Sequence, residues 1–303
     1  MKEEPAEVTR DGSTLRGTWT LPEQPKSVVI CVHGSGPMDR DQNGKGGKLE
    51  TFRVMAEALY QAGFACLRYD KRGVGASGGD YEALGQADLV ADVQAWIPQA
   101  TARGLGPVWL LGHSEGTALA PAAAEGHAVA GLILLCPYIT PGREILMQQA
   151  AKGEQLVAEL RGFKGVVARA AMAIFGKPTR MQARVIAKLE TTDAPKVRVG
   201  LKKVPTRWLR DFVTADVAAI HQANQRPTLV VVAARDAQCP PEDGAKIAAL
   251  NPNAELVVLE DLSHLLRHTT VDGFDDYLRQ LKSENDPRPA EVVVEWLTRQ
   301  VSA

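Results

Sequence analysis

The stretch VWLLGHSEGTALA, from Val108 to Ala120, passes from an apolar run into an alanine-rich, helix-like segment. At the junction Gly112 and Gly116 flank Ser114, which matches the pattern G-x-S-x-G at a strand-to-helix turn. Such a turn strains its central residue and lifts that side chain above the sheet, so bulky neighbours would clash. We therefore interpret Ser114 as a nucleophile. The alternative is a glycine-bounded turn whose serine only caps the following helix.

Strand-like and helix-like segments alternate on both sides of this turn. The apolar strand-like runs are SVVICVHG, FACLRYD, PVWLLGH, VAGLILLCP, PTLVVVAARD and AELVVLEDLSH. Residues 49–62, 84–102, 116–125 and 288–301 are predicted as helices. The alternation predicts an α/β fold with a doubly wound parallel sheet. Residues 6–21 alternate around an Asp-Gly turn, which favours an antiparallel hairpin at the sheet edge.

This alternation stops in the middle of the chain. From about Tyr138 to Arg226 the sequence is helix-like, without strands, and the strand pattern then resumes. We predict that residues 1–137 and 226–303 form the core domain. Residues 138–225 are then a helical cap, inserted in the core over one end of the sheet.

A serine hydroxyl needs a general base and an acid that orients the base, in the chain order Ser, acid, His. His264 directly follows the last apolar strand, and Asp236 ends the strand before it. We predict that these two residues complete a triad with Ser114. Rivals for these roles are His268, Glu260 and Asp261. Of the other histidines, His127 and His221 are expected on the surface, His113 pointing away from the site, and His33 shaping the following loop.

The tetrahedral intermediate of acyl transfer also needs an oxyanion hole. One donor is expected to be the backbone N–H of Glu115, directly after the nucleophile. The other should come from the loop HGSG, residues 33–36. We assign it to the Ser35 N–H, with Gly34 and Gly36 as alternatives.

Together these segments resemble the α/β-hydrolase family over essentially the whole chain. The matching segments are VHGSGPMDRDQN, YDKRGVGASGG, GHSEG, RDAQCPPED and SHLLR. The first loop and the run beginning WLRDFVTADV look like bacterial esterases related to the serine aminopeptidase group. The resemblance implies an eight-stranded, mostly parallel sheet with strand 2 antiparallel and a cap between strands 6 and 7. It implies the triad Ser114, Asp236 and His264, and no cofactor or metal.

Two charged loops need a separate interpretation in this family context. Asp39, Arg40 and Asp41 are interpreted as residues that fix the long loop 34–48, because charged loop residues most often pair with each other or face water. The segment DKRGVGASGG lacks the spacing of a phosphate-binding loop. We therefore interpret it as a structural loop.

Composition limits the partners and the compartment. The 303 residues carry 35 basic and 36 acidic side chains, so the net charge of -1 gives no reason to expect nucleic acid. No apolar run reaches the roughly 18 to 20 residues that span a bilayer. The N-terminal MKEEPAEVTR has no apolar signal core. We expect a cytoplasmic protein whose four cysteines are buried free thiols.

These features predict a serine hydrolase that cleaves a small-molecule carboxylic ester. A cap would restrict long acyl chains, so short to medium chains are expected. A peptidase, thioesterase or acyltransferase could use the same triad, and a non-catalytic binding protein could keep the fold. The natural ester and the choice between monomer and homodimer stay open.

Overall fold

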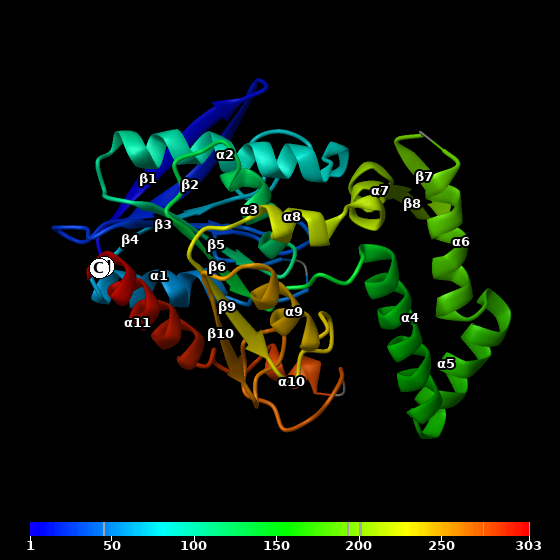
Figure 1. Cartoon of the computed structure of the whole chain (residues 1–303). Helices are drawn as coiled ribbons and strands as arrows, with labels where there is room; N and C mark the ends of the chain where they lie inside the picture. Colours follow the sequence, from blue (N-terminus) through cyan, green and yellow to red (C-terminus); the bar gives the residue numbers. More distant parts are fainter. Residues whose placement is uncertain (45, 193, 200–201, 275, 303) are drawn as a thin grey trace.

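Eight strands form one sheet at the centre of the computed structural model (Figure 1), which describes residues 1–44, 46–192, 194–199, 202–274 and 276–302. The strand order is β1-β2-β4-β3-β5-β6-β9-β10. β2 runs antiparallel to β1 and β4, and every other neighbouring pair is parallel. This confirms the predicted mostly parallel sheet. The strands are β1 (Glu3–Arg10), β2 (Ser13–Thr20), β3 (Val28–Val32), β4 (Ala65–Tyr69), β5 (Val108–His113), β6 (Gly131–Leu135), β9 (Thr228–Ala233) and β10 (Ala254–Leu259).

The predicted edge hairpin is confirmed in β1 and β2. Asp11 and Gly12 join the strands with φ angles of 47° and 72°. Two successive positive φ angles suit the right-handed twist of the strands that a two-residue turn connects. Glycine and aspartate tolerate this conformation better than bulky residues, so the turn fixes the register in which Arg10 faces Ser13.

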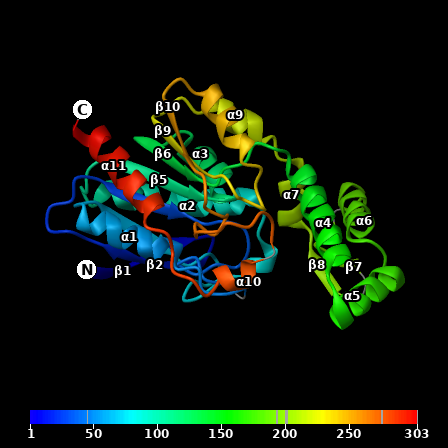
Figure 2. The same cartoon turned by 90° about the horizontal axis from the view of Figure 1, so that it is seen from below.

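Helices cover both faces of the sheet (Figures 1 and 2). α2 (Gln86–Ala102), α3 (Gly116–Ala124) and α9 (Glu242–Leu250) pack on one face, and α1 (Thr51–Gln61) and α11 (Arg288–Ser302) pack on the other. β3 packs against helices on both faces. Val28 and Ile30 belong to the apolar cluster on the α2 side, and Val29 belongs to the cluster on the α1 side. A strand buried on both faces reads as a continuous apolar run. Two short elements complete the core, η1 (Tyr81–Ala83) and α10 (Tyr277–Gln280).

The segment between β6 and β9 projects to one side of the sheet (Figures 1 and 2). A third apolar cluster, which includes Tyr138, Ile145, Phe212 and Cys239, joins its base to the core. α8 packs against α3 and α9. The elements are α4 (Gly142–Glu159), α5 (Gly162–Phe175), α6 (Pro178–Glu190), β7 (Lys196–Val199), β8 (Lys202–Pro205), α7 (Arg207–Thr214) and α8 (Val217–Ala223).

The prediction that this segment holds no strand is wrong, because β7 and β8 form an antiparallel pair. Their sequences, KVRV and KKVP, are short and rich in lysine and arginine. Such segments carry little of the apolar signal by which strands are predicted. Val197 of β7 is buried, with 3% of its surface exposed. Among the described residues, no helix combines the length and the apolar composition needed to cross a bilayer.

Candidate active site

Ser114 lies in the turn between β5 and α3 with a φ of 55°, a left-handed conformation that is costly for a residue other than glycine. A Cβ atom on Gly112 would lie 2.2 Å from the Gly116 carbonyl oxygen. A Cβ atom on Gly116 would lie 2.1 Å from the carbonyl oxygen of Val32. The two glycines therefore allow the backbone approach that the turn requires. The serine in the strained position is not a simple helix cap, because α3 has no side-chain cap.

His264 and Asp236 form a buried pair at the ends of β10 and β9. The Nδ1 atom of His264 lies 2.7 Å from Oδ2 of Asp236. The other carboxylate oxygen accepts backbone N–H groups from Gln238 at 2.7 Å and Cys239 at 2.9 Å. With Nδ1 as the donor to this fixed carboxylate, the Nε2 atom of His264 is left as a proton acceptor.

Cys239 lies beside this pair. Burial raises the pKa of its thiol well above the usual value, and the Ser114 side chain acts on that pKa in the opposite direction. Ligand atoms of Asp236, Cys239 and His264 all lie within 4.8 Å of one another. No hydrogen bond directly joins Ser114 to His264 in the described part of the chain. Catalytic hydrogen bonds are often long without substrate and tighten when it binds. The structure thus brings together Asp236 and His264 and adds Cys239, which sequence reasoning had treated only as a buried thiol.

His113, the residue before Ser114, holds the backbone of the His264 loop. Its Nε2 atom lies 2.9 Å from the His264 carbonyl oxygen, and its Nδ1 atom lies 2.6 Å from Nε2 of Gln42. Burial lowers the pKa of His113 to about 3. The neutral ring can therefore donate to the carbonyl and accept from the Gln42 amide. The prediction that His113 points away from the site is wrong.

The other candidates for base and acid lie outside this cluster. His268 is exposed and pairs with Asp261 at 3.2 Å, and Glu260 is exposed as well. The expectation that His221 is a surface residue is wrong: its ring is buried and lies 3.2 Å from the Tyr138 carbonyl oxygen. A histidine in a polar run carries no sequence signal that separates these environments.

The predicted oxyanion loop passes directly beside the nucleophile. A Cβ atom on Gly34 would lie 3.2 Å from Cβ of Ser114. In the described part of the chain, the N–H groups of Ser35 and Glu115 have no hydrogen-bond acceptor. The arrangement therefore leaves the Ser35 and Glu115 donors available.

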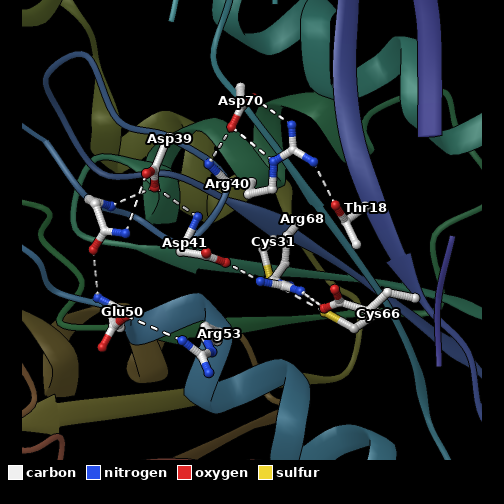
Figure 3. Close-up of polar contacts among 12 residues, drawn as sticks. Thr18, Cys31, Asp39, Arg40, Asp41, Glu50, Arg53, Cys66, Arg68 and Asp70 are labelled. Carbon is white, nitrogen blue, oxygen red and sulfur yellow. Dashed lines mark hydrogen bonds and ion pairs between the residues drawn. The ribbon is translucent and has the colours of Figure 1, made fainter. Parts of the chain in front are cut away.

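Ion pairs fix the long loop after β3 to the sheet (Figure 3). The Arg40 guanidinium donates to both carboxylate oxygens of Asp70, at 3.1 and 2.6 Å, and to Oγ1 of Thr18 at 2.6 Å. Asp41 pairs with the buried Arg68. Such bidentate guanidinium–carboxylate contacts give geometric precision as well as energy. The loop-fixing interpretation is confirmed for both residues.

Asp39 and Asp70 also organise backbone around them. Asp39 accepts N–H groups from Asp41 at 2.9 Å and Asn43 at 2.8 Å (Figure 3). Asp70, at the end of β4, accepts the Ala76 N–H at 2.9 Å. The segment DKRGVGASGG therefore folds around its own aspartate, as expected for a structural loop.

Two overlapping groups offer three ligand atoms each to a metal ion. They are His113, Cys136 and His264, and Asp236, Cys239 and His264. Burial raises the pKa of the Cys136 and Cys239 thiols well above the usual value, which disfavours the thiolates that metals bind. The Asp236 carboxylate is already satisfied by three donors. The arrangement suits a hydrogen-bonded cluster better than metal coordination.

A pocket of about 380 Å³ opens beside this cluster. It lies between α4 and the loop after β9, and Asp236 and Ala237 are among its lining residues. Lys152 of α4 donates to the Ala237 carbonyl at 3.0 Å. The segment between β6 and β9 is therefore in direct contact with the loop that carries Asp236.

Comparison with known proteins places this chain in a family. The family described as Serine aminopeptidase, S33, matches residues 23–270. The chain belongs to this family. Among curated proteins it is similar to Esterase EstD of Thermotoga maritima, with 24% identity over 98% of this chain and 68% of that protein. It is also similar to N-formylmaleamate deformylase of Pseudomonas putida, with 28% identity over 67% of this chain and 72% of the relative.

Solved structures of the same fold cover the whole chain. Est1E of Butyrivibrio proteoclasticus, solved with ferulic acid, has a TM-score of 0.63 at 20% identity, covering 98% of this chain and 100% of that one. The Pyrococcus furiosus esterase Pf2001 has a TM-score of 0.60 at 18% identity, covering 99% and 91%. At these identities the likeness shows the fold, which is that of the α/β hydrolases.

Proposed function

We propose that this protein is a carboxylesterase in which Ser114 attacks the ester carbonyl. His264 takes the serine proton and passes it to the leaving alcohol, while Asp236 stabilises the imidazolium. Water then attacks the acyl-enzyme by the same route and releases the acid. The observations that carry the proposal are the 2.7 Å contact between His264 and Asp236 and the strained backbone of the Ser114 turn.

The backbone around Ser114 supports the same chemistry. Negative charge develops on the former carbonyl oxygen, and the N–H groups of Ser35 and Glu115 are the proposed donors to it. Each is without another acceptor in the described ranges, and α3 begins directly after Glu115. Removal of one such donor typically costs about 100- to 1000-fold in rate.

The choice of an ester as substrate is supported by the relatives. EstD and Pf2001 carry the name esterase, and Est1E was solved with ferulic acid bound. A triad alone does not distinguish esters from peptides or thioesters, because substrate choice lies in the pocket. A polyketide transferase of Penicillium sp is also similar over 44% of this chain, so acyl transfer is the second candidate.

The segment 138–225 is proposed as a cap that limits the acyl chain to short or medium length. Gln149 and Lys152 of α4 donate to the carbonyl oxygens of Gln238 and Ala237, at 3.3 and 3.0 Å. Trp208 of α7 donates to the Glu115 carboxylate at 2.5 Å. These contacts with the loop after Asp236 and with Glu115 support the proposed position of the cap beside the site.

Rates on p-nitrophenyl esters from acetate to palmitate, measured beside aminoacyl anilides, test this proposal. The account predicts the highest kcat/KM on acetate to hexanoate and none above background on anilides. Faster turnover of anilides would favour a peptidase. A maximum on palmitate would contradict the cap argument, and product formed only with an added alcohol or amine acceptor would favour acyl transfer.

A further inference from the structure

Lys71 is a buried cation that the proposed triad does not use. It follows β4, and only 2% of its surface is exposed. Its ammonium donates to the carbonyl oxygen of Gly34 at 2.6 Å. Burying an ammonium costs several kcal/mol unless it is paired and hydrogen-bonded. A buried lysine bound to the oxyanion loop therefore calls for a specific role.

The carbonyl that Lys71 binds belongs to the peptide that carries the proposed oxyanion donor. The Gly34 C=O and the Ser35 N–H are the two ends of one planar peptide unit, and in a trans peptide they point in opposite directions. The hydrogen bond from Lys71 fixes the direction of the Gly34 carbonyl. The Ser35 N–H of the same peptide is therefore fixed to point away from Lys71. The positive charge also polarises the peptide, which makes its N–H a stronger donor to an anion.

Glu115 places a negative charge close to the positive charge of this lysine. Its Oε2 atom lies 3.8 Å from Nζ of Lys71, and both side chains are buried. Its Oε1 atom accepts Nε2 of Gln86 at 3.0 Å and Nε1 of Trp208 at 2.5 Å. Glu115 is also the residue whose backbone N–H is the second proposed donor. One buried ion pair thus joins the two peptides that would bind the oxyanion.

The surroundings of Lys71 favour an exact placement of its charge. Nζ lies 5.8 Å from the centre of the Tyr81 ring, a distance at which a cation is attracted to the aromatic face. The ammonium is therefore held by contacts from three parts of the chain, with Gly34, Glu115 and Tyr81.

We propose that Lys71 and Glu115 are positioning residues that orient the Ser35 and Glu115 N–H groups toward the oxyanion of the transition state. The inference rests on the proposed esterase function. It assigns the lysine of DKRGVGASGG, a segment interpreted above as a structural loop, to the stabilisation of developing charge. Neither side chain touches substrate, so both act through the backbone.

Steady-state kinetics of Lys71→Met, Lys71→Arg and Glu115→Gln test the proposal, with p-nitrophenyl butyrate as substrate. The account predicts that Lys71→Met lowers kcat by about 10- to 100-fold and changes KM less than threefold, because the orienting contact matters most when charge develops. Lys71→Arg keeps the charge and should recover part of the loss. Glu115→Gln keeps the shape of the side chain and should lie between wild type and Lys71→Met.

A trifluoromethyl ketone supplies a readout that general loosening of the fold would not reproduce. Such a ketone adds the serine and forms a stable oxyanion, so its affinity should fall in the same proportion as kcat/KM across the three variants. Lys26→Met is the matched control. Lys26 also donates to a backbone carbonyl, that of Ala62 at 3.1 Å, but it is exposed and lies before β3, at the opposite end of that strand from the oxyanion loop. It should leave both quantities unchanged.

The outcomes separate this inference from the proposed function. If Ser114→Ala abolishes hydrolysis while folded Lys71→Met keeps kcat and ketone affinity within threefold of wild type, the positioning role is wrong and the esterase proposal stands. If Lys71→Met does not fold, kcat and ketone affinity of Glu115→Gln relative to wild type decide the question. Values unchanged from wild type then overturn the positioning role. Hydrolysis that survives in Ser114→Ala overturns the proposed function and this inference with it.

Discussion

The Nε2 atom of His113 lies 2.9 Å from the carbonyl oxygen of His264, 151 residues along the chain. The residue before the proposed nucleophile thus holds the backbone of the residue proposed as its base. Gln42, from the long loop after β3, completes the contact by donating to the other ring nitrogen at 2.6 Å. Three loops that are distant in sequence are locked together by one neutral imidazole, which makes the geometry of the site depend on its protonation.

Acidification should destabilise the fold through its buried histidines. Burial lowers the pKa from 6.5 to about 3 in His33 and His113 and to about 4 in His221. Between these values and 6.5 the unfolded chain binds more protons than the folded one, so stability is fully present above about pH 6.5 and is lost as pH falls. The expected loss is about 2 kcal/mol per histidine at pH 5. Urea unfolding at pH 7.5, 6 and 5 measures it.

His221→Gln tests this prediction against wild type. Removing the buried His221 should make the fall of unfolding free energy with pH less steep, because one linked proton is lost. Equal slopes in the variant and wild type would contradict the account.

Gly112→Ala and Gly116→Ala should prevent correct folding of the turn. Each added Cβ atom would lie within 2.2 Å of a backbone oxygen, and backbone on both sides is fixed by the sheet and α3. We expect insoluble protein, or a large fall in Tm with loss of hydrolysis. Gly153→Ala is the control, because nothing lies within 4 Å of its added Cβ atom in α4. There alanine should raise the unfolding free energy by up to about 1 kcal/mol, and a similar result at Gly112 would refute the steric argument.

Arg40→Ala should free the long loop from β4. The variant loses a bidentate pair with Asp70 and leaves this buried carboxylate short of donors, which should cost about 3 to 5 kcal/mol. We expect lower Tm and a lower kcat, since the same loop carries Ser35. Arg53→Ala removes a surface pair with Glu50 and should change Tm by less than 1 °C (Figure 3). Matching effects of the two variants would show that the loop does not depend on Arg40.

Trp208→Phe tests the link between α7 and Glu115. The phenyl ring can keep the stacking on Phe212, where the ring centres lie 5.2 Å apart, but it loses the N–H that binds Oε1 of Glu115. We expect kcat to fall several-fold because the charge balance around Glu115 is disturbed. Trp109→Phe is the control: its buried indole N–H has no hydrogen-bond partner among the residues that the structure describes, so the same change removes no hydrogen bond. An unchanged kcat in Trp208→Phe would show that α7 does not influence the site.

The sequence predicts the features that local spacing controls. Ser114, Asp236 and His264 each follow a strand whose apolar run is plain, and parallel strands bring such ends to one edge of the sheet. The contacts of Lys71 with Gly34 and of His113 with His264 join residues 37 and 151 positions apart. Each depends on loop conformations that a single sequence does not specify. β7 and β8 escape prediction for another reason, since a short charged strand differs little from a polar loop.

Mass spectrometry after reaction with a fluorophosphonate tests the central claim most directly. The reagent phosphonylates a serine only when a base and an oxyanion site activate it. The account predicts one adduct, on the peptide that contains Ser114, formed together with complete loss of ester hydrolysis and absent in Ser114→Ala. An adduct on another residue, or hydrolysis that persists in Ser114→Ala, would contradict it.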